Sequence, residues 1–149
     1  MTFGVIEAVL KPILYEALSL TQSDKGNIQL FDVSSGCLNI EAQCGFNDSF
    51  LEIFKSVSAA TGCACGRAIR LRQPVAISDV FADEEYAPYR QAAAEAGYRS
   101  VISLPLIARG DDLVGVLSVH RVVPGTRETD IEVLNGITDF AAEAIARHR

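Results

Sequence analysis

The chain has 149 residues, of which 49% are hydrophobic and 21% are charged, and this length and composition are typical of one globular domain. Its 19 acidic and 13 basic residues give a net charge of −6, so neither nucleic acid nor an anionic membrane is expected as a partner. No apolar run approaches the roughly 20 residues that span a bilayer, and the N-terminal residues lack a signal-peptide pattern. We therefore predict a single cytoplasmic domain over residues 1–149.

The first part of the chain predicts a helix and then a β-hairpin. Residues 3–20 place apolar side chains at helical spacing, with Thr2 placed to cap the helix and Pro12 expected to kink it. Strands are expected over residues 26–33 and 37–44. The second strand is apolar at its even-numbered positions, which predicts one buried face made of Leu38, Ile40, Ala42 and Cys44.

The middle of the chain predicts short elements separated by loops. A helix capped by Asp48 or Ser49 is expected to run to about Ala59. The following elements are expected in this order: a loop over residues 61–66, a helix over 67–71, a strand over 74–78, an acidic loop over 79–85 and a helix over 86–96 that ends at Gly97.

Residues 100–121 predict a second hairpin, because two apolar, β-branched runs flank a turn at Gly110 and Asp111. With a two-residue turn, Val101 lies opposite His120. One face is then wholly apolar and is expected to pack against helices: Ile102, Leu104, Leu106 and Ala108 beside Leu113, Gly115, Leu117 and Val119. The other face holds Val101, Ser103, Pro105 and Ile107 beside Val114, Val116, Ser118 and His120. A longer turn would exchange the two faces.

The end of the chain predicts a turn and a last helix. Pro124 and Gly125 are typical of a turn, and Thr126 is placed to cap the helix that follows. The apolar stripe of this helix consists of Ile131, Leu134, Ile137, Phe140, Ala141, Ala144 and Ile145. The order of elements, with two hairpins separated by helices, predicts an α+β fold with a central antiparallel sheet of five or six strands.

The mixed face of the second hairpin is the candidate ligand site, because apolar walls with a few polar groups are typical of small-molecule pockets. Its candidate residues are Val101, Ser103, Pro105, Val116, Ser118 and His120. Tyr86, Tyr89 and Arg90 share one face of a predicted helix and would add two phenols and a guanidinium, which suits an aromatic ligand with a negative charge. The alternatives are a half-solvated sheet face, a histidine that bonds within the protein, and an ordinary amphipathic helix.

The four cysteines are Cys37, Cys44, Cys63 and Cys65, and none forms a C-x-x-C pair. Since the chain has only two histidines, a structural zinc centre has poor support; no metal site is predicted and free thiols are expected. Cys63 and Cys65 are candidate redox residues if Arg67 lowers the pKa of a thiol. The alternative is that these two cysteines only fill space in the loop.

Several segments, in the order KGNIQLFD, LNIEAQCGF, CGRAIRLRQPVAISDV, AGYRSVISLPL and LVGVLSVH, together resemble the GAF domain of bacterial signal-transduction proteins over roughly residues 5–147. The resemblance implies that the terminal helices pack on one face of the sheet and that a ligand pocket, with shorter helices and loops, lies on the other. It also implies a sensory module that is joined to a histidine kinase, a cyclase or a transcription regulator. No output domain is recognised in the chain, and neither the ligand nor a cofactor is assigned.

Two kinds of GAF protein can be compared residue by residue. Free methionine sulfoxide reductases resemble this chain in the segment TGCACGRA, where Cys65 matches one of their cysteines. Their catalytic cysteine lies in a segment that reads FADEEYAPYRQAAAEAG here and contains no cysteine. The Cys-His dipeptide of bilin-binding GAF domains and the NKFDE-like signature of the cyclic-nucleotide-binding type are also missing from the sequence.

These observations predict a non-enzymatic sensory domain that binds a small molecule. One alternative is a thiol enzyme that reduces free methionine-(R)-sulfoxide through Cys63 and Cys65, since such a reaction needs a nucleophilic and a resolving thiol. The other is a dimerisation module whose pocket is filled by its own side chains. If the apolar stripes of the terminal helices are wider than one sheet face can cover, the excess predicts a homodimer through those helices.

Overall fold

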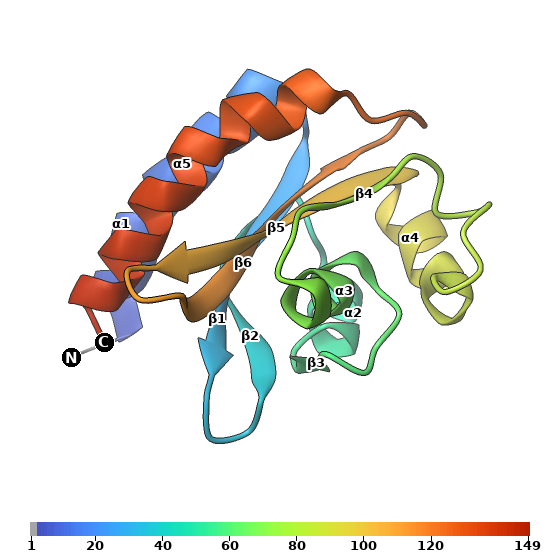
Figure 1. The fold of residues 1–149 in the computed structure, drawn as a ribbon. Coiled ribbons are helices and arrows are strands. Elements are labelled where there is room, and N and C mark those ends of the chain that lie inside the picture. The colour runs from blue at the N-terminus through green and yellow to red at the C-terminus, as the bar shows by residue number, and fades with distance from the viewer. Residues whose placement is uncertain (1–2) are drawn as a thin grey trace.

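A six-stranded antiparallel sheet forms the centre of the computed structural model, which describes residues 3–149 (Figure 1). The strands lie in the order β3-β2-β1-β6-β5-β4. Their bounds are β1 Lys25–Asp32, β2 Cys37–Cys44, β3 Val57–Ser58, β4 Val75–Ile77, β5 Ser100–Ala108 and β6 Asp112–Arg121. The helices are α1 Phe3–Thr21, α2 Asp48–Ile53, α3 Ala64–Leu71, the 3₁₀ turn η1 Ala87–Tyr89, α4 Arg90–Ala96 and α5 Glu128–Arg147. Thr2, the predicted cap of the first helix, lies outside the described residues.

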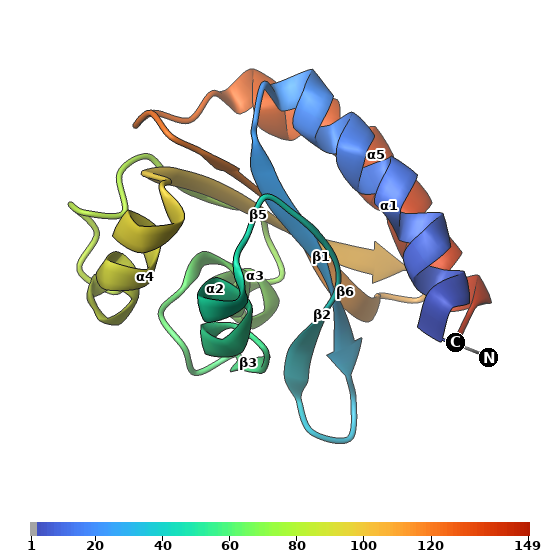
Figure 2. The same cartoon turned by 180° about the vertical axis from the view of Figure 1, so that it is seen from behind.

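The sheet has a different set of helices on each face. Helices α1 and α5 lie side by side on one face, while α2, α3 and α4 lie on the other (Figures 1 and 2). A separate core lies under each group: aliphatic residues such as Leu14 and Leu117 build the first, and aromatic residues such as Phe50 and Tyr98 contribute to the second. The predicted α+β fold, with the terminal helices together on one face, is confirmed.

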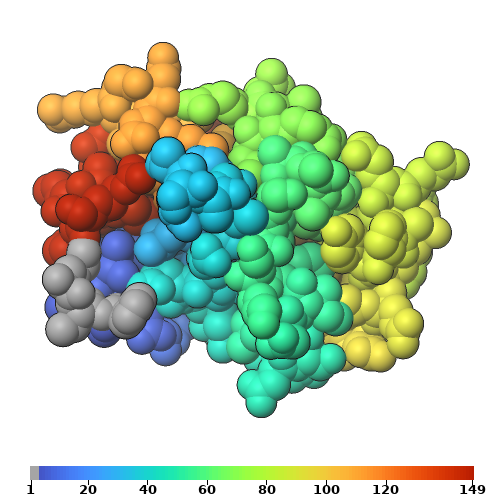
Figure 3. All heavy atoms as spheres, turned by 90° about the horizontal axis from the view of Figure 1, so that it is seen from below, coloured from blue at the N-terminus to red at the C-terminus, as the bar shows by residue number. Residues whose placement is uncertain are grey.

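The two groups of helices are separated by the hairpin of β1 and β2. Figure 3 shows the molecule from the end of this hairpin, which lies between the C-terminal end of α5 on one side and the segments around α2 and α3 on the other. No helix within residues 3–149 is long and apolar enough to cross a membrane.

The hairpin of β5 and β6 has the predicted register over most of its length. Val101 lies opposite His120, and Ser103 lies opposite Ser118. The register shifts only beyond Leu106, close to the turn. Most residues of the hairpin therefore lie on the predicted face of the sheet.

The turn itself is one residue longer than predicted. Ala108 pairs with Asp112, so three residues turn the chain, and Asp111 has a positive φ of 58°, which aspartate tolerates better than most residues. Val114 therefore belongs to the core under α1 and α5, and Leu113 belongs to the opposite core. The predicted faces of these two residues are wrong, because one extra residue in the turn region moves each side chain to the other face.

A second irregularity divides the apolar residues of β2 between the two faces. Ile28 pairs with Ala42 but Gln29 pairs with Ile40, so Glu41 is an extra residue in the ladder. As a result, Ala42 and Cys44 pack with the core under α1 and α5, whereas Leu38 and Ile40 pack with the opposite core. The prediction of one shared buried face is wrong, since a bulge reverses the alternation of the strand.

The predicted helix that reaches Ala59 ends early. The Asn47 side chain, one residue before the predicted caps, accepts a hydrogen bond of 3.0 Å from the Phe50 amide and so begins α2, which ends at Ile53. Residues 57–58 form the edge strand β3 beside β2 instead. Pairing with the sheet supplies backbone partners that a longer helix would have supplied.

Three further helix boundaries differ from the prediction. Helix α3 begins at Ala64, three residues early, and the predicted helix over residues 86–96 is divided into η1 and α4. Arg127 occupies the N-cap position of α5. Oγ1 of the predicted cap, Thr126, lies 3.2 Å from Oγ of Ser78. This hydrogen bond connects the residue after β4 to the segment that precedes α5.

Candidate functional site

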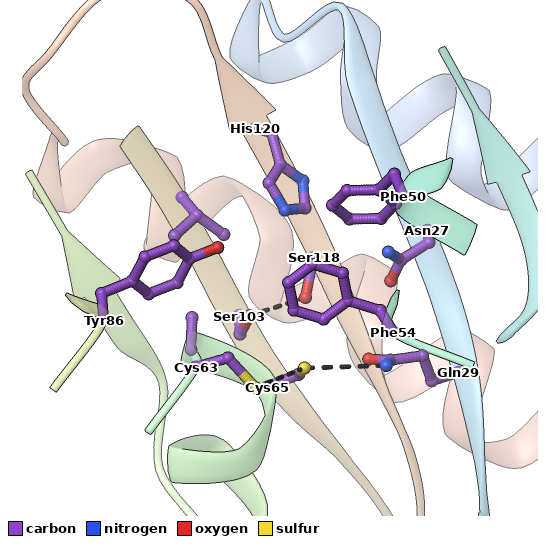
Figure 4. A pocket seen from close by; sticks show the side chains of 12 residues that line it. Asn27, Gln29, Phe50, Phe54, Cys63, Cys65, Tyr86, Ser103, Ser118 and His120 are labelled. Carbon is purple, nitrogen blue, oxygen red and sulfur yellow. Dashed lines mark hydrogen bonds between the residues drawn. The ribbon is translucent and has the colours of Figure 1, made fainter. Parts of the chain in front are cut away.

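A small buried cavity lies between the sheet and the short helices of the second face (Figure 4). Its volume is about 10 Å³, which is roughly the room that one water molecule needs. Strands β1, β5 and β6 form its floor, and α2, α3 and the segment before η1 form its walls. The lining residues are Asn27, Gln29, Phe50, Phe54, Cys63, Ala64, Cys65, Tyr86, Val101, Ser103, Ser118 and His120.

Two buried serines face each other on the floor of this cavity. The Oγ atoms of Ser103 and Ser118 are 2.6 Å apart, so one hydroxyl donates a hydrogen bond to the other. This contact follows directly from the register of the hairpin, in which the two residues are opposite each other. The sequence therefore placed these two serines together on one face of the sheet.

Three buried polar atoms in the described part of the chain have no hydrogen-bond partner within the protein, and all three belong to residues that line this cavity. They are Oδ1 of Asn27, Oε1 of Gln29 and Nδ1 of His120. The three residues are only 3%, 1% and 4% exposed. Leaving one buried polar atom unpaired costs about 1–3 kcal/mol, so these atoms favour a hydrogen-bonding partner in the cavity.

The imidazole of His120 is uncharged at neutral pH. Burial lowers the pKa of His120 to about 3, and the hydrogen bond to the backbone of Lys25 opposes that effect only in part. Neutral imidazole carries one N–H. Nδ1 of this imidazole is one of the three unpaired atoms.

Cys63 and Cys65 bring two thiols together at the start of α3. Cys63 is the N-cap residue of the helix, and its Sγ lies 3.6 Å from that of Cys65. The hydrogen bond from Cys65 lowers the pKa of Cys63 to about 6, assisted by the Thr61 hydroxyl and the Gly66 backbone and opposed by burial. The same hydrogen bond and burial raise the pKa of Cys65. At neutral pH, Cys63 is therefore a thiolate beside a protonated thiol.

Arg67 holds segments of the site in position, and it is not the main cause of the lowered pKa of Cys63. Its guanidinium donates to both carboxylate oxygens of Asp83, and its Nε donates to the Gly62 carbonyl at 2.8 Å. Asp83 also accepts a hydrogen bond of 3.1 Å from the amide of Tyr86. This ion pair therefore joins α3 to the segment that holds Tyr86 against the cavity.

The hydroxyl of Tyr86 bonds to the hydroxyl of Tyr98, and both side chains are buried. Burial raises the pKa of Tyr86 and of Tyr98, so both phenols are neutral at physiological pH. The ring of Tyr98 also meets the ring of His120, with centroids 4.6 Å apart. These contacts fix the upper edge of the cavity.

The remaining predicted site residues do not line the cavity. Tyr89 is half-buried and packs its ring against Phe54, and Arg90 donates to the backbone carbonyls of Val80 and Asp83. The predicted single helix over residues 86–96 is divided by η1, but the rings of Tyr86 and Tyr89 still lie together, with centroids 5.7 Å apart. Of the remaining candidates on the sheet, Val116 is buried in the second core and Pro105 is half-buried, and neither lies among the lining residues.

Five lining residues were missed by the sequence analysis: Asn27, Gln29, Phe50, Phe54 and Ala64. Asn27 lies opposite Ser118, and Gln29 lies opposite Val116, in the pairing of β1 with β6. The alternation of side chains along β1 is the signal that could have identified Asn27 and Gln29. It required knowledge that β1 pairs with the last strand of the chain, which a local pattern does not supply.

A comparison with protein families assigns the fold. The model of the GAF domain family matches residues 5–145. The chain belongs to the GAF domain family. No curated protein sequence matches this GAF domain significantly.

Solved structures share the fold at low sequence identity. The GAF domain of a phosphoenolpyruvate-protein phosphotransferase from Coxiella burnetii has a TM-score of 0.81 at 18% identity, over 95% of this chain and 83% of that chain. A GAF domain/HD domain protein from Geobacter sulfurreducens has a TM-score of 0.78 at 16% identity, over 95% and 92% of the two chains. A type II free methionine-R-sulfoxide reductase from Thermoplasma acidophilum has a TM-score of 0.77 at 15% identity, over 97% and 95%.

The fold of this GAF domain is thus shared by the GAF domain of a phosphotransferase and by a methionine sulfoxide reductase. Fold alone does not assign a reaction, so the function must be argued from the cavity. Within residues 3–149, no cluster of three or more histidine, cysteine or acidic side chains is arranged to hold a metal ion.

Proposed function

We propose that this GAF domain is a non-catalytic sensory domain that binds a small molecule in the cavity lined by Ser103, Ser118 and His120. The observation that carries the proposal is the presence of three unpaired buried polar atoms around one cavity, on Asn27, Gln29 and His120. A ligand that bonds to these atoms would remove their desolvation penalty, and ligand sites commonly combine such groups with apolar walls.

The arrangement of β6 gives such a ligand a route to the terminal helices. Ser118 and His120 face the cavity, while the neighbouring Leu117 and Val119 belong to the core under α1 and α5. A change in the packing of one face would therefore reach the other through a single strand. A regulator works in this way when the ligand prefers one of two packing arrangements, and an output domain joined to the helices would respond to it.

Native mass spectrometry of the domain, freshly purified from its natural host, tests this proposal. The expected result is a bound small molecule that is released on denaturation and is lost in the variant Ser103→Val. Ser34→Val, which changes an exposed serine in the turn after β1, is the matched control and should retain the ligand. An empty cavity in every preparation would favour the alternative of a dimerisation module. The small cavity volume of about 10 Å³ is consistent with that alternative.

A second candidate function is a thiol reductase that acts on free methionine-(R)-sulfoxide. The specific observation in its favour is the pair of sulfur atoms 3.6 Å apart, with Cys63 as a thiolate. In this reaction the Cys63 thiolate attacks the sulfoxide, the S–O bond of the substrate breaks, and the oxygen with one proton from solvent stays on Cys63 as a sulfenic acid while methionine is released. The Cys65 thiol then forms a disulfide with Cys63 and releases water, and an external dithiol reduces the disulfide.

Turnover of methionine sulfoxide in the presence of dithiothreitol distinguishes the two functions. The reductase function requires turnover in the parent domain, loss of all turnover in Cys63→Ser, and loss of repeated turnover in Cys65→Ser. The same measurements on Cys37→Ser are the control, since this half-buried cysteine lies on β2 away from the pair. An inactive parent protein would leave the sensory function in place and exclude the enzyme.

The outer surface of α1 and α5 supports a homodimer as the functional unit. An apolar groove between the two helices is lined by Pro12, Ile13, Glu16, Gly136, Ile137 and Phe140. Phe140, which lines this groove, is 62% exposed and Tyr15 on α1 is 49% exposed, so the apolar stripes are wider than the sheet covers. Light scattering should give a dimer mass for the parent and a monomer mass for Phe140→Glu, whereas a monomeric parent would rule out this interface.

A further inference from the structure

The sulfur atoms of Cys63 and Cys65 are in contact at the wall of the cavity. They lie 3.6 Å apart, and both residues belong to the lining (Figure 4). A disulfide requires a separation of about 2.0 Å, so a small movement would join the two sulfur atoms. The other two cysteines, Cys37 and Cys44, lie at opposite ends of β2 and are partly exposed.

The start of α3 gives the two thiols different roles. Cys63 occupies the N-cap position, where the helix dipole favours a negative charge. The hydrogen bond from the Cys65 thiol lowers the pKa of Cys63 to about 6, and burial opposes this effect. The pKa of Cys65 is raised by the same hydrogen bond and by burial. Near neutral pH, Cys63 is therefore suited to attack an oxidant and Cys65 is suited to resolve the product.

The size of the cavity limits which oxidants reach the pair. The side chains of Cys63 and Cys65 are only 1% and 8% exposed, so an oxidant must enter the cavity to meet them. The volume of about 10 Å³ is roughly that of one water molecule. Hydrogen peroxide is larger than water by one oxygen atom. Alkyl hydroperoxides and methionine sulfoxide are several times larger and would have to displace walls such as Phe54 and Tyr86.

We propose that Cys63 and Cys65 form a peroxide-reactive pair, which hydrogen peroxide converts into a disulfide. The Cys63 sulfur attacks one oxygen of the peroxide, the O–O bond breaks, and Cys63 becomes a sulfenic acid. The other oxygen leaves as hydroxide and takes a proton from solvent to form water. The Cys65 sulfur then displaces the hydroxyl group from the Cys63 sulfur, and this group leaves as a second water molecule with the thiol proton.

Two electrons pass from the two sulfur atoms to the peroxide in this sequence, and an external dithiol returns them. A disulfide between residues only two apart in the chain is strained, which makes it easier to reduce and suits a reversible modification. The proposal goes beyond the proposed function, because it adds an oxidant as a second input to the cavity. It holds whether or not another small molecule binds there.

Formation of the disulfide would change the packing of the cavity. Nε2 of Gln29 on β1 lies 3.6 Å from Sγ of Cys65, and this contact changes when the Cys65 sulfur moves toward Cys63. The start of α3 is also tied to the segment before η1 through the ion pair of Arg67 with Asp83. Oxidation would therefore act on both the floor and the walls of the site.

The test uses the variant Cys37→Ser/Cys44→Ser, which keeps the peroxide-reactive pair as the only thiols of the chain. The reduced protein is treated with hydrogen peroxide at pH 7, denatured and alkylated with N-ethylmaleimide, and its intact mass is measured. We expect no alkylation and the loss of two hydrogen atoms. Treatment with dithiothreitol before alkylation should restore both thiols.

A second oxidant tests the role of the cavity. The rate of oxidation by tert-butyl hydroperoxide is compared with that by hydrogen peroxide, for the protein and for free cysteine. The preference of the protein for hydrogen peroxide should exceed that of free cysteine about 10-fold or more, because the bulky oxidant must first displace the walls. The same protein unfolded in urea is the control and should lose this additional preference.

Single variants in the same background separate the two thiols. Cys65→Ser should stop at the sulfenic acid, which dimedone traps as an adduct, whereas Cys63→Ser should give no adduct in the same time. If either variant fails to fold, the mass and the oxidant preference of the Cys37→Ser/Cys44→Ser protein still decide the question.

The proposal would be overturned by full alkylation of the pair after peroxide treatment, by an oxidant preference equal to that of free cysteine, or by equal dimedone adducts in Cys63→Ser and Cys65→Ser. Oxidation of the pair by methionine sulfoxide but not by peroxide would also overturn it, and would support the reductase instead. The sensory function is judged separately, by whether the domain from its natural host carries a bound molecule.

Discussion

The two cores of this GAF domain use one sheet in different ways. The core under α1 and α5 is a continuous cluster of aliphatic side chains, whereas the core under α2 and α3 surrounds paired hydroxyls, two thiols and three unpaired polar atoms. Strand β6 contributes Leu117 to the first core and Ser118 to the second. The first core can supply most of the stability, which allows the second to hold polar groups that stabilise the fold poorly and suit a ligand.

The largest effect is expected from a comparison of two leucines of β6. Leu117→Ala removes a side chain from the aliphatic core and should destabilise the domain by about 2.7–5 kcal/mol. Leu113→Ala, at the edge of the second core near the turn, should cost clearly less, because that site can relax. Urea denaturation measures both free energies of unfolding. Equal losses would show that the two cores contribute alike.

The second test uses pH to report on the polar core. Unfolded histidine titrates near its ordinary pKa of 6.5, whereas burial lowers the pKa of His120 to about 3 in the folded state. Between these values the unfolded state binds more protons, so stability falls as the pH falls, by about 1.4 kcal/mol per pH unit.

At pH 5 this difference amounts to about 2 kcal/mol relative to pH 7. The variant His120→Phe should lack this loss, and the difference between the two proteins isolates His120 from the carboxyl groups that also titrate. The measurement is denaturant unfolding of both proteins from pH 7 to pH 5. Parallel stability profiles would show that His120 is protonated in the folded state.

A smaller effect is expected from the tyrosine pair at the edge of the cavity. Tyr86→Phe leaves the buried hydroxyl of Tyr98 without its partner and should cost about 1–2 kcal/mol. Tyr15→Phe, which removes an exposed hydroxyl on α1, should change the free energy of unfolding very little. If thermal unfolding gives the two variants the same midpoint, the hydroxyl pair does not stabilise the second core.

The smallest effect concerns an ion pair outside both cores. Asp79 accepts a hydrogen bond of 2.6 Å from Arg99, and both side chains are partly exposed to solvent. The variant Asp79→Asn should therefore lose at most about 1 kcal/mol, and the loss should shrink in high salt. The new amide oxygen can still accept the 3.0 Å turn bond from the Phe81 amide, so the variant removes only the ion pair, and a larger, salt-independent loss in urea denaturation would contradict this prediction.

Much of the fold could be predicted from the sequence because its signals are local. The alternation in residues 100–121 placed Ser103 opposite Ser118, and the structure brings the two hydroxyls together. The packing of both terminal helices on one face was implied by the resemblance to GAF domains, and the structure confirms it (Figure 1). Local patterns failed at two points where one residue was inserted into a ladder, beside Val114 and at Glu41. A bulge leaves no mark in hydrophobic alternation until the partner strand is known.

The candidate site was found only in part, because half of it comes from distant segments. Asn27 and Gln29 look like ordinary solvent-facing residues within β1, and their burial depends on pairing with β6. Arg90 does not line the cavity for a similar reason: its guanidinium bonds to loop carbonyls that the sequence could not place. The proximity of Cys63 and Cys65 was visible in the sequence, but the protonation states of the two thiols depend on the helix start that the structure supplies.

The bulge at Glu41 restricts how the length of β2 can change. Without this one residue the ladder with β1 would be regular, and Leu38, Ile40, Ala42 and Cys44 would keep their present sides of the sheet. A single-residue insertion or deletion elsewhere in the strand would turn the side chains beyond it to the wrong face. Among relatives with this hairpin, single-residue deletions in the strand should therefore fall at the bulge.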